Sequence, residues 1–232
     1  MIIAERKPLA EIIAMIGDNR KILLVGCRSC AAVCMAGGDR EVAALAEALR
    51  LYAQVHSLDW KISETAVERQ CEKEWAKEVG ETADCGLILS LGCGVGVQFL
   101  QEASTVPVFP ALNTSNMGGP EEQGIYLEKC GGCGDCTLHL TGGICPVARC
   151  AKSLLNGPCG GSQDGKCEVN PDTPCAWQAI YDSLQRLQRL SLLKEIIPPK
   201  DWRSSHAGGP RKIVRPQMVL SEDEKKIKEG LE

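Results

Sequence analysis

The segment that decides how this chain folds is residues 130–175, CGGCGDCTLHLTGGICPVARCAKSLLNGPCGGSQDGKCEVNPDTPC. It holds eight of the 14 cysteines in the 232-residue chain and few large apolar residues. A stretch of this composition cannot bury enough hydrophobic surface to fold on a core of its own. Either disulfides or bound metal must hold it together, and the choice between them sets the class of protein.

The rest of the sequence favours metal over disulfides. The N-terminal stretch MIIAERKPLAEII carries charges through its only apolar part and lacks a signal-peptide pattern. No window of 18 uninterrupted apolar residues occurs, so no membrane span is expected. We therefore expect a cytoplasmic protein, whose thiols stay reduced and whose clustered cysteines bind metal. The alternative is a secreted disulfide protein whose signal has been removed.

Composition argues against a nucleic-acid partner. The formal net charge is −4, whereas a nucleic-acid surface needs a basic face. Only nine residues are Phe, Trp or Tyr, too few for a base-stacking platform. We expect no binding of nucleic acid.

Residues 1–120 alternate between helical and strand patterns. KILLVG (21–26) and GLILSL (86–91) are apolar runs typical of buried parallel strands. Asp39, with Glu41 behind it, is a candidate N-cap. The full set of predicted elements is helix 8–16, strand 21–26, helix 39–52, strand 53–58, helix 65–79 capped by Thr65, strand 86–91, helix 95–103 and strand 106–109. This alternation predicts an α/β fold with a small doubly wound parallel sheet.

Three parts follow one another along the predicted chain. An α/β domain carrying an N-terminal iron–sulfur site spans 1–120, and a cysteine-rich metal-cluster module spans 121–175. Residues 176–232 form an amphipathic helix, which begins near Cys175 and reaches about Lys194, and then a tail beyond Pro198 and Pro199. The closing sequence SEDEKKIKEG (221–230) is expected to be a short exposed helix or disordered. The tail either binds a partner subunit or is a free terminus.

The first candidate metal site lies at the carboxyl edge of the predicted sheet. Cys27, Cys30 and Cys34 follow the first strand as CRSCAAVC, one helical turn apart, and Cys93 directly follows the third strand. Ligands of α/β folds bind at this edge. Cys71, near the start of a helix after the second crossover, could reach the same edge. Five cysteines therefore compete for four ligand positions.

Thiolates converging from several loops suit either a [4Fe–4S] cluster or tetrahedral zinc. A CxxCxxxC triplet with a remote fourth cysteine is more typical of iron–sulfur ligation, and inert core cysteines are the remaining alternative. Cys85 begins the third strand at the opposite edge and is predicted to be a buried non-ligand. GCGVGV (92–97) resembles a phosphate-binding loop but lacks the full dinucleotide pattern.

The second candidate site is the cysteine-rich module itself. Cys130, Cys133 and Cys136 form CxxCxxC, and Cys145 is followed by Pro146, elements that bacterial ferredoxins also use with a different spacing. The remaining potential ligands are Cys150, Cys159, Cys167 and Cys175. Eight thiolates could hold two clusters, one cluster and one zinc, or one metal with spare thiols. A purely structural zinc module is the main alternative. His139 could replace a ligand, but a surface position is favoured.

Four motifs together resemble one known family. CGGCGDC…TGGICPVARCAKSLLNGPCGGSQDGKCEV (130–169) looks like the methylenetetrahydrofolate reductase C-terminal module. GCRSCAAVCMAGGDREV (26–42), AVERQCEKE (66–74) and LSLGCGVGVQ (89–98) resemble the remainder of the small iron–sulfur subunit of the acetogen-type reductase. The resemblance covers the chain to about residue 195.

The resemblance implies a role that the cysteine spacings alone do not. In this family the small subunit pairs with a TIM-barrel catalytic subunit that carries a flavin, expected to be FMN, and reduces methylenetetrahydrofolate in the Wood–Ljungdahl pathway. The chain would relay electrons to that flavin through at least two [4Fe–4S] clusters, with zinc a further possibility in 130–175. Electrons would come from a ferredoxin-like donor or one linked to hydrogenase or heterodisulfide reductase. The alternatives are a zinc-stabilised assembly subunit without a redox role, and a thiol- or corrinoid-linked methyl-transfer protein.

Overall fold

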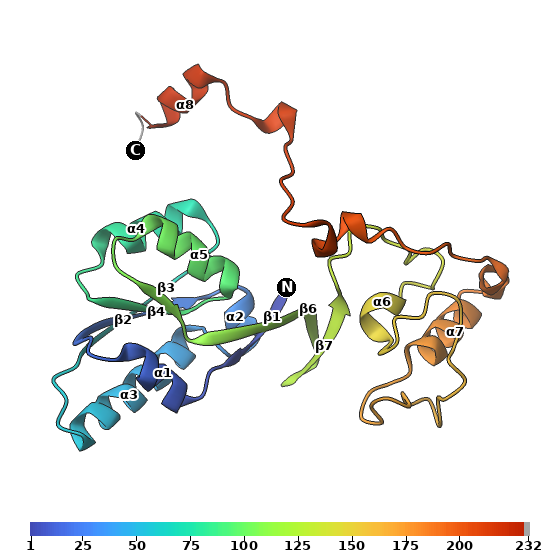
Figure 1. Ribbon diagram of the computed structural model, residues 1–232, viewed down its shortest axis with the longest axis horizontal. Coiled ribbons are helices and arrows are strands. Elements are labelled where there is room, and N and C mark those ends of the chain that lie inside the picture. The colour runs from blue at the N-terminus through green and yellow to red at the C-terminus, as the bar shows by residue number, and fades with distance from the viewer. Residues whose placement is uncertain (230–232) are drawn as a thin grey trace.

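The computed structural model describes residues 1–229 and consists of an α/β domain, a cysteine-rich module and a C-terminal tail (Figure 1). The C-terminal part predicted from the sequence extends to residue 232, and its last three residues lie outside the described range. None of the helices within residues 1–229 combines the length and apolar character needed to cross a membrane.

The α/β domain is built on a parallel sheet of four strands in the order β3-β2-β4-β5. Its strands are β2 (Lys21–Cys27), β3 (Lys61–Val67), β4 (Leu87–Leu91) and β5 (Val108–Pro110). All five residues of β4 are buried, as expected for a central strand covered on both faces.

Helices cover both faces of this sheet (Figure 1). On one face α1 (Leu9–Ile16) and α3 (Asp39–Val55) pack Ile12, Ile16 and Leu49 against Leu24 and Leu89. On the other face α4 (Lys73–Thr82) and α5 (Gly94–Ala103) supply a second apolar cluster. The doubly wound parallel sheet predicted from the sequence is therefore confirmed.

Two of the predicted elements are wrong. The strand predicted at 53–58 belongs to α3, which continues to Val55 because buried residues recur at helical spacing up to Ala53. The helix predicted at 65–79 begins only at Lys73, because residues 61–67 form β3. β3 is an edge strand whose side chains are mostly exposed, so its sequence KISETAV lacks the apolar run that marks the other strands. The N-cap of α3 is Gly38 rather than Asp39, and the Glu41 carboxylate accepts a 2.9 Å hydrogen bond from the Gly38 amide.

A second sheet joins the α/β domain to the cysteine-rich module. It is antiparallel, in the order β1-β6-β7, and consists of β1 (Ile2–Arg6), β6 (Leu112–Glu122) and β7 (Ile125–Cys130). The sequence analysis missed all three strands, since β6 and β7 are largely exposed and β6 contains Gly118, Gly119 and Pro120. β7 ends at Cys130, the first cysteine of the second group.

The cysteine-rich module has little regular structure. Its helices are α6 (Pro146–Arg149), α7 (Ala176–Arg186) and the 3₁₀ helix η1 (Leu190–Lys194). The buried apolar cluster of the module comprises Trp177, Ile180 and Leu184 from α7. The amphipathic helix predicted to reach Lys194 ends at Arg186, and Gln188 adopts a left-handed φ of 57° before η1 begins.

The chain then crosses back over the module and leaves it. The elements of this last part are the 3₁₀ helices η2 (Trp202–Ser204), η3 (His206–Gly208) and η4 (Pro216–Met218), and α8 (Glu222–Glu229). α8 agrees with the short exposed helix expected for the closing sequence. The other short helix, α2 (Cys30–Val33), lies in the α/β domain beside β1 and β2.

Candidate metal centres

Three loops bring cysteines of the first group to the carboxyl edge of the parallel sheet. Cys27 is the last residue of β2, Cys71 lies between β3 and α4, and Cys93 is the N-cap of α5 directly after β4. Burial raises the pKa of Cys71, and the neighbouring Cys93 and Cys27 raise it further. Because β2, β3 and β4 are parallel neighbours, all three cysteines lie at the edge of the sheet that the strand order predicts.

Cys30 and Cys34 take different places around this edge. Cys30 opens α2 and, like Cys71, lies close enough to Arg69 to affect its guanidinium. Cys34 is buried and its thiol donates a 3.2 Å hydrogen bond to the Ile2 carbonyl of β1. Burial raises the pKa of Cys34. Of the five competing cysteines, Cys34 is therefore the one bonded to the second sheet.

Gln70 fixes the relative position of two of these loops. Its side chain is fully buried, donates to the Val25 carbonyl at 2.8 Å and accepts from the Ser90 hydroxyl at 2.6 Å. A Cβ atom at Gly92 would overlap the Gln70 side-chain oxygen, and one at Gly96 would lie 2.8 Å from the Gln70 Cβ. The glycines of GCGVGV thus make room for Gln70, which holds the Cys71 loop against the Cys93 loop.

Two arginines at the same edge are held in ion pairs. Arg28 pairs with Asp39 at 3.0 Å and with Glu68 at 3.4 Å, and Arg69 pairs with Glu72 at 2.9 Å. Hydrogen bonding to Glu72 raises the pKa of Arg69. Cys93 also lies at the positive end of the α5 dipole. Cations and helix N-termini favour the thiolate form of cysteine, which is the form that binds metal.

The second group contains two loops with the same backbone-to-sulfur hydrogen bond. In each Cys-Gly-Gly sequence the amide of the second glycine donates to the cysteine sulfur at 3.4 Å, from Gly132 to Cys130 and from Gly161 to Cys159. Backbone hydrogen bonds also lower the pKa of Cys167, mainly those from Asn170 and Val169. Donors aimed at sulfur stabilise the thiolate.

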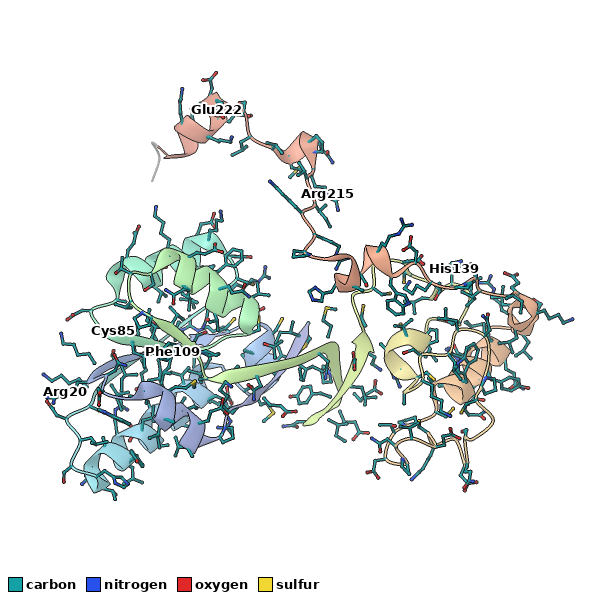
Figure 2. The ribbon with its side chains drawn as sticks, viewed as in Figure 1. Arg20, Cys85, Phe109, His139, Arg215 and Glu222 are labelled. Carbon is teal, nitrogen blue, oxygen red and sulfur yellow. The ribbon has the colours of Figure 1, made fainter. Side chains whose placement is uncertain are left out.

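The other cysteines of the module lie between its loops and its small core. Cys150 and Cys175 pack against the cluster that contains Trp177, and Cys145 is the N-cap of α6. Cys133 is half-buried and its thiol donates to the Asp135 carbonyl at 3.6 Å, whereas Cys136 is exposed. His139 is exposed, as expected for a surface histidine (Figure 2).

The antiparallel sheet connects the two groups. Ile2 of β1 pairs with Met117 of β6, and Met117 pairs with Cys130 of β7. Cys34 is bonded to the Ile2 carbonyl, so Cys34 and Cys130 lie at opposite ends of one row across three strands. Two strand spacings correspond to about 10 Å.

The donors at both groups suit a thiolate-bound metal. Within residues 1–229, no three or more His, Cys, Asp and Glu side chains are arranged to bind a single metal ion. The donors placed at the sheet edge are nevertheless all thiols, and Cys93 lies at a helix N-terminus, which favours a thiolate. Thiolates from several loops are ligands of both iron–sulfur clusters and structural zinc.

Residues 109–203 match the family model described as methylene-tetrahydrofolate reductase C terminal. This part of the chain is similar to that family. No curated protein and no solved structure matches the chain. The methylene-tetrahydrofolate reductase C-terminal segment begins at β5, includes the β6–β7 hairpin and all eight cysteines of the second group, and ends within η2.

Cys85 lies away from both groups. It precedes β4 and is near Arg20, at the end of the sheet opposite the cysteine loops (Figure 2). Its side chain is half-buried against the apolar cluster under α4 and α5, and burial raises its pKa. This position agrees with a cysteine that is not a ligand, although it is less buried than predicted.

The sequence analysis missed two residues that contact the candidate ligands. Gln70 directly precedes Cys71. Gly92 and Gly96, on either side of Cys93, could have indicated that a large side chain packs against this loop. Lys200 lies 65 residues beyond Asp135 in the sequence but contacts it within the methylene-tetrahydrofolate reductase C-terminal segment. No local pattern marks Lys200, because its partners come from a distant loop.

Proposed function

We propose that this chain is an iron–sulfur electron-transfer subunit of a methylenetetrahydrofolate reductase complex. Its partner would be a TIM-barrel catalytic subunit carrying FMN, and the complex would act in the Wood–Ljungdahl pathway. The family of residues 109–203 supports the link to this reductase. The observation that supports the electron-transfer role is the position of Cys27, Cys71 and Cys93 after three neighbouring parallel strands, at one edge of the sheet.

The proposed ligands divide into two sets. The first centre would use Cys27, Cys30, Cys71 and Cys93, because Cys34 is engaged with β1. The second set comprises Cys130, Cys133, Cys136, Cys145, Cys150, Cys159, Cys167 and Cys175. When bound, clusters supply one-electron steps at potentials that hydrogen bonds and charge around the sulfurs adjust.

The protein's own part in this function is to hold the ligands and join the centres. Gln70 fixes the Cys71 loop against the Cys93 loop, and Arg28 and Arg69 offset negative charge at the edge. The row from Cys34 through Ile2 and Met117 to Cys130 connects the two cysteine groups, which supports electron transfer between the proposed centres. One centre would be reduced by an external donor, either a ferredoxin-like protein or one linked to hydrogenase or heterodisulfide reductase. The other centre would pass electrons to the partner's flavin.

A zinc-stabilised assembly subunit without a redox role is the second candidate. The two Cys-Gly-Gly loops support this candidate, because amide-to-sulfur hydrogen bonds also hold the thiolate ligands of structural zinc. Zinc in the second group and a cluster in the first would combine the two.

Metal and sulfide content of protein purified without oxygen distinguishes these candidates. About eight iron and eight sulfide per chain would correspond to two [4Fe–4S] clusters and support electron transfer. Zinc without iron, in a colourless protein, would contradict it. Cys71→Ser and Cys93→Ser should each remove one cluster and slow reduction of the partner's flavin, while the matched variants Cys34→Ser and Cys85→Ser should keep full iron. Unchanged iron in Cys93→Ser would overturn the ligand assignment.

A further inference from the structure

Residues 200–211, here called the strap, lie across the Cys130–Cys136 loop. The Ser204 hydroxyl donates to the Cys133 carbonyl at 2.8 Å, and Arg211 donates to the Gly132 carbonyl at 3.4 Å. Gly134 has a left-handed φ of 79°, and a Cβ there would overlap the Ser204 carbonyl. The strap and the loop are thus in backbone contact, which attaches the C-terminal segment to the candidate ligands.

Lys200 is the charged residue that the strap buries. Its side chain is only 4% exposed, and its ammonium donates to the Asp135 carbonyl at 2.5 Å and pairs with the Asp135 carboxylate at 3.2 Å. The ring centroid of Trp202 lies 5.9 Å from the same ammonium. Burying an ammonium is unfavourable unless it is paired, so this position must be fixed by its partners.

The ammonium of Lys200 shares a backbone acceptor with a candidate ligand sulfur. The Cys133 thiol donates to the same Asp135 carbonyl, at 3.6 Å, so the lysine nitrogen and the sulfur meet at one oxygen atom. Asp135 is itself 58% exposed, so water already shares its charge. The sulfur of Cys133 is the less hydrated of the two partners.

We infer that Lys200 is a positioning residue for the second metal centre, where its ammonium hydrogen-bonds the Cys133 thiolate and offsets its charge. This inference rests on the proposed function, because it requires Cys133 to bind metal. Outer hydrogen bonds of this kind orient ligands, and their loss commonly weakens metal binding by about 10–100-fold. Hydrogen bonds to sulfur and nearby positive charge also raise the reduction potential of a cluster.

The inference assigns the strap a task beyond linking α7 to the tail. A purely structural lysine would be satisfied by Asp135 alone, and the strap would remain attached through Ser204 and Arg211. A positioning lysine must instead affect the metal, even when the strap stays in place. The two roles therefore differ in their effect on metal retention.

The test compares Lys200→Met, Lys200→Arg and Lys212→Met in the full-length chain purified without oxygen. Lys212 is an exposed lysine directly after the strap and serves as the matched control. Metal per chain is measured by mass spectrometry, and the half-life of bound metal is measured against a competing chelator. Where the metal is iron, an electron paramagnetic resonance titration gives the midpoint potentials.

Lys200→Met should release metal from the second centre about ten-fold faster than the wild type, consistent with the loss of an outer hydrogen bond. With iron bound, one midpoint potential should fall as well. Lys200→Arg should restore most of the retention, and Lys212→Met should match the wild type. Wild-type retention and unchanged potentials in a folded Lys200→Met would overturn the inference.

Ser204→Ala tests whether attachment of the strap, and not the lysine charge, is responsible. It removes the hydrogen bond to the Cys133 carbonyl and leaves the ammonium in place. If Ser204→Ala releases metal as fast as Lys200→Met, the charge has no special role and the inference fails; slower release supports it. A wild-type chain without any metal would instead refute the proposed function, which keeps the two failures distinguishable.

Discussion

The side-chain oxygen of Gln70 accepts a 2.6 Å hydrogen bond from the Ser90 hydroxyl inside the α/β domain. The same hydroxyl accepts from the Gly92 amide at 3.1 Å, so one buried network links the residue before Cys71 to the residue before Cys93. A buried network of this kind is strong only when every member is satisfied. The proposed first metal centre would therefore depend on groups that are not themselves ligands.

Glycine substitutions in the Cys93 loop test this dependence. Gly92→Ala and Gly96→Ala should each force Gln70 out of place and cost about 1–3 kcal/mol, because the added methyl group overlaps Gln70. Both should also reduce the metal bound at the first centre. Gly94→Ala is the matched control, since its Cβ would meet only the Thr114 hydroxyl, at 3.8 Å. The three variants are compared by urea unfolding monitored by hydrogen exchange in β4, and by metal analysis. Equal effects at all three positions would contradict the prediction.

The raised pKa of Cys85 gives a pH-dependent test. The thiolate is the form that iodoacetamide modifies, and an ordinary cysteine has a pKa of about 8.5. Burial raises the pKa of Cys85, so at a given pH less of it is thiolate. Labelling of Cys85 should therefore remain slow at neutral pH and increase only above the ordinary cysteine pKa. Peptide mass spectrometry, with free N-acetylcysteine in the same tube as the reference, measures this. Equal rates at pH 7 would show that Cys85 is not protected.

Removing metal should unfold the second module and spare the first domain. The module's buried apolar cluster consists of three α7 residues, whereas the α/β domain has two larger clusters, one on each face of its sheet. A segment with so small a core depends on its bound metal for folding. After treatment with a chelator, hydrogen exchange should rise across 130–200 while β2 and β4 stay protected. Continued protection of α7 in metal-free protein would show that its own core is sufficient.

The sequence predicted the α/β domain because burial and pattern coincide there. KILLVG and GLILSL are strands covered on both faces, so their apolar runs are unambiguous. β3 could not be predicted in this way, because as an edge strand it exposes most of its residues. The antiparallel sheet was missed for the same reason, since β6 is largely polar and contains glycine and proline.

The candidate site was predictable in part. Strand order placed Cys27 and Cys93 at the same edge, because parallel strands end together. The different place of Cys34 was not predictable, since its thiol bonds to Ile2 of an unforeseen strand. Lys200 was missed because only the three-dimensional path of the strap brings it to Asp135, two residues after Cys133.

The last prediction concerns the tail beyond the strap. All side chains described from Pro210 to Ile227 are exposed, and the tail leaves the module and is drawn apart from the rest of the chain, with α8 above α4 and α5 in the view (Figure 1). Arg215 and Glu222 mark its course in Figure 2. From Lys212 to Glu229, the hydrogen bonds found in the described chain join residues within this segment. The tail therefore adds little to the stability of the chain itself.

From the exposed apolar residues in the tail we predict that it binds the proposed partner subunit. They include Ile213, Val214 and Met218, which are 73%, 56% and 75% exposed. Single apolar residues scattered over a surface are normal, but several exposed close together mark an interaction site. Removing residues 212–232 should leave the urea unfolding midpoint and the metal content unchanged but weaken binding to the flavin-carrying subunit at least ten-fold. Replacing Ile213 and Met218 with serine should reproduce most of that loss, while Lys225→Ser and Lys226→Ser in α8 should not. Isothermal titration of the purified subunits measures it, and full affinity without the tail would place the interface elsewhere.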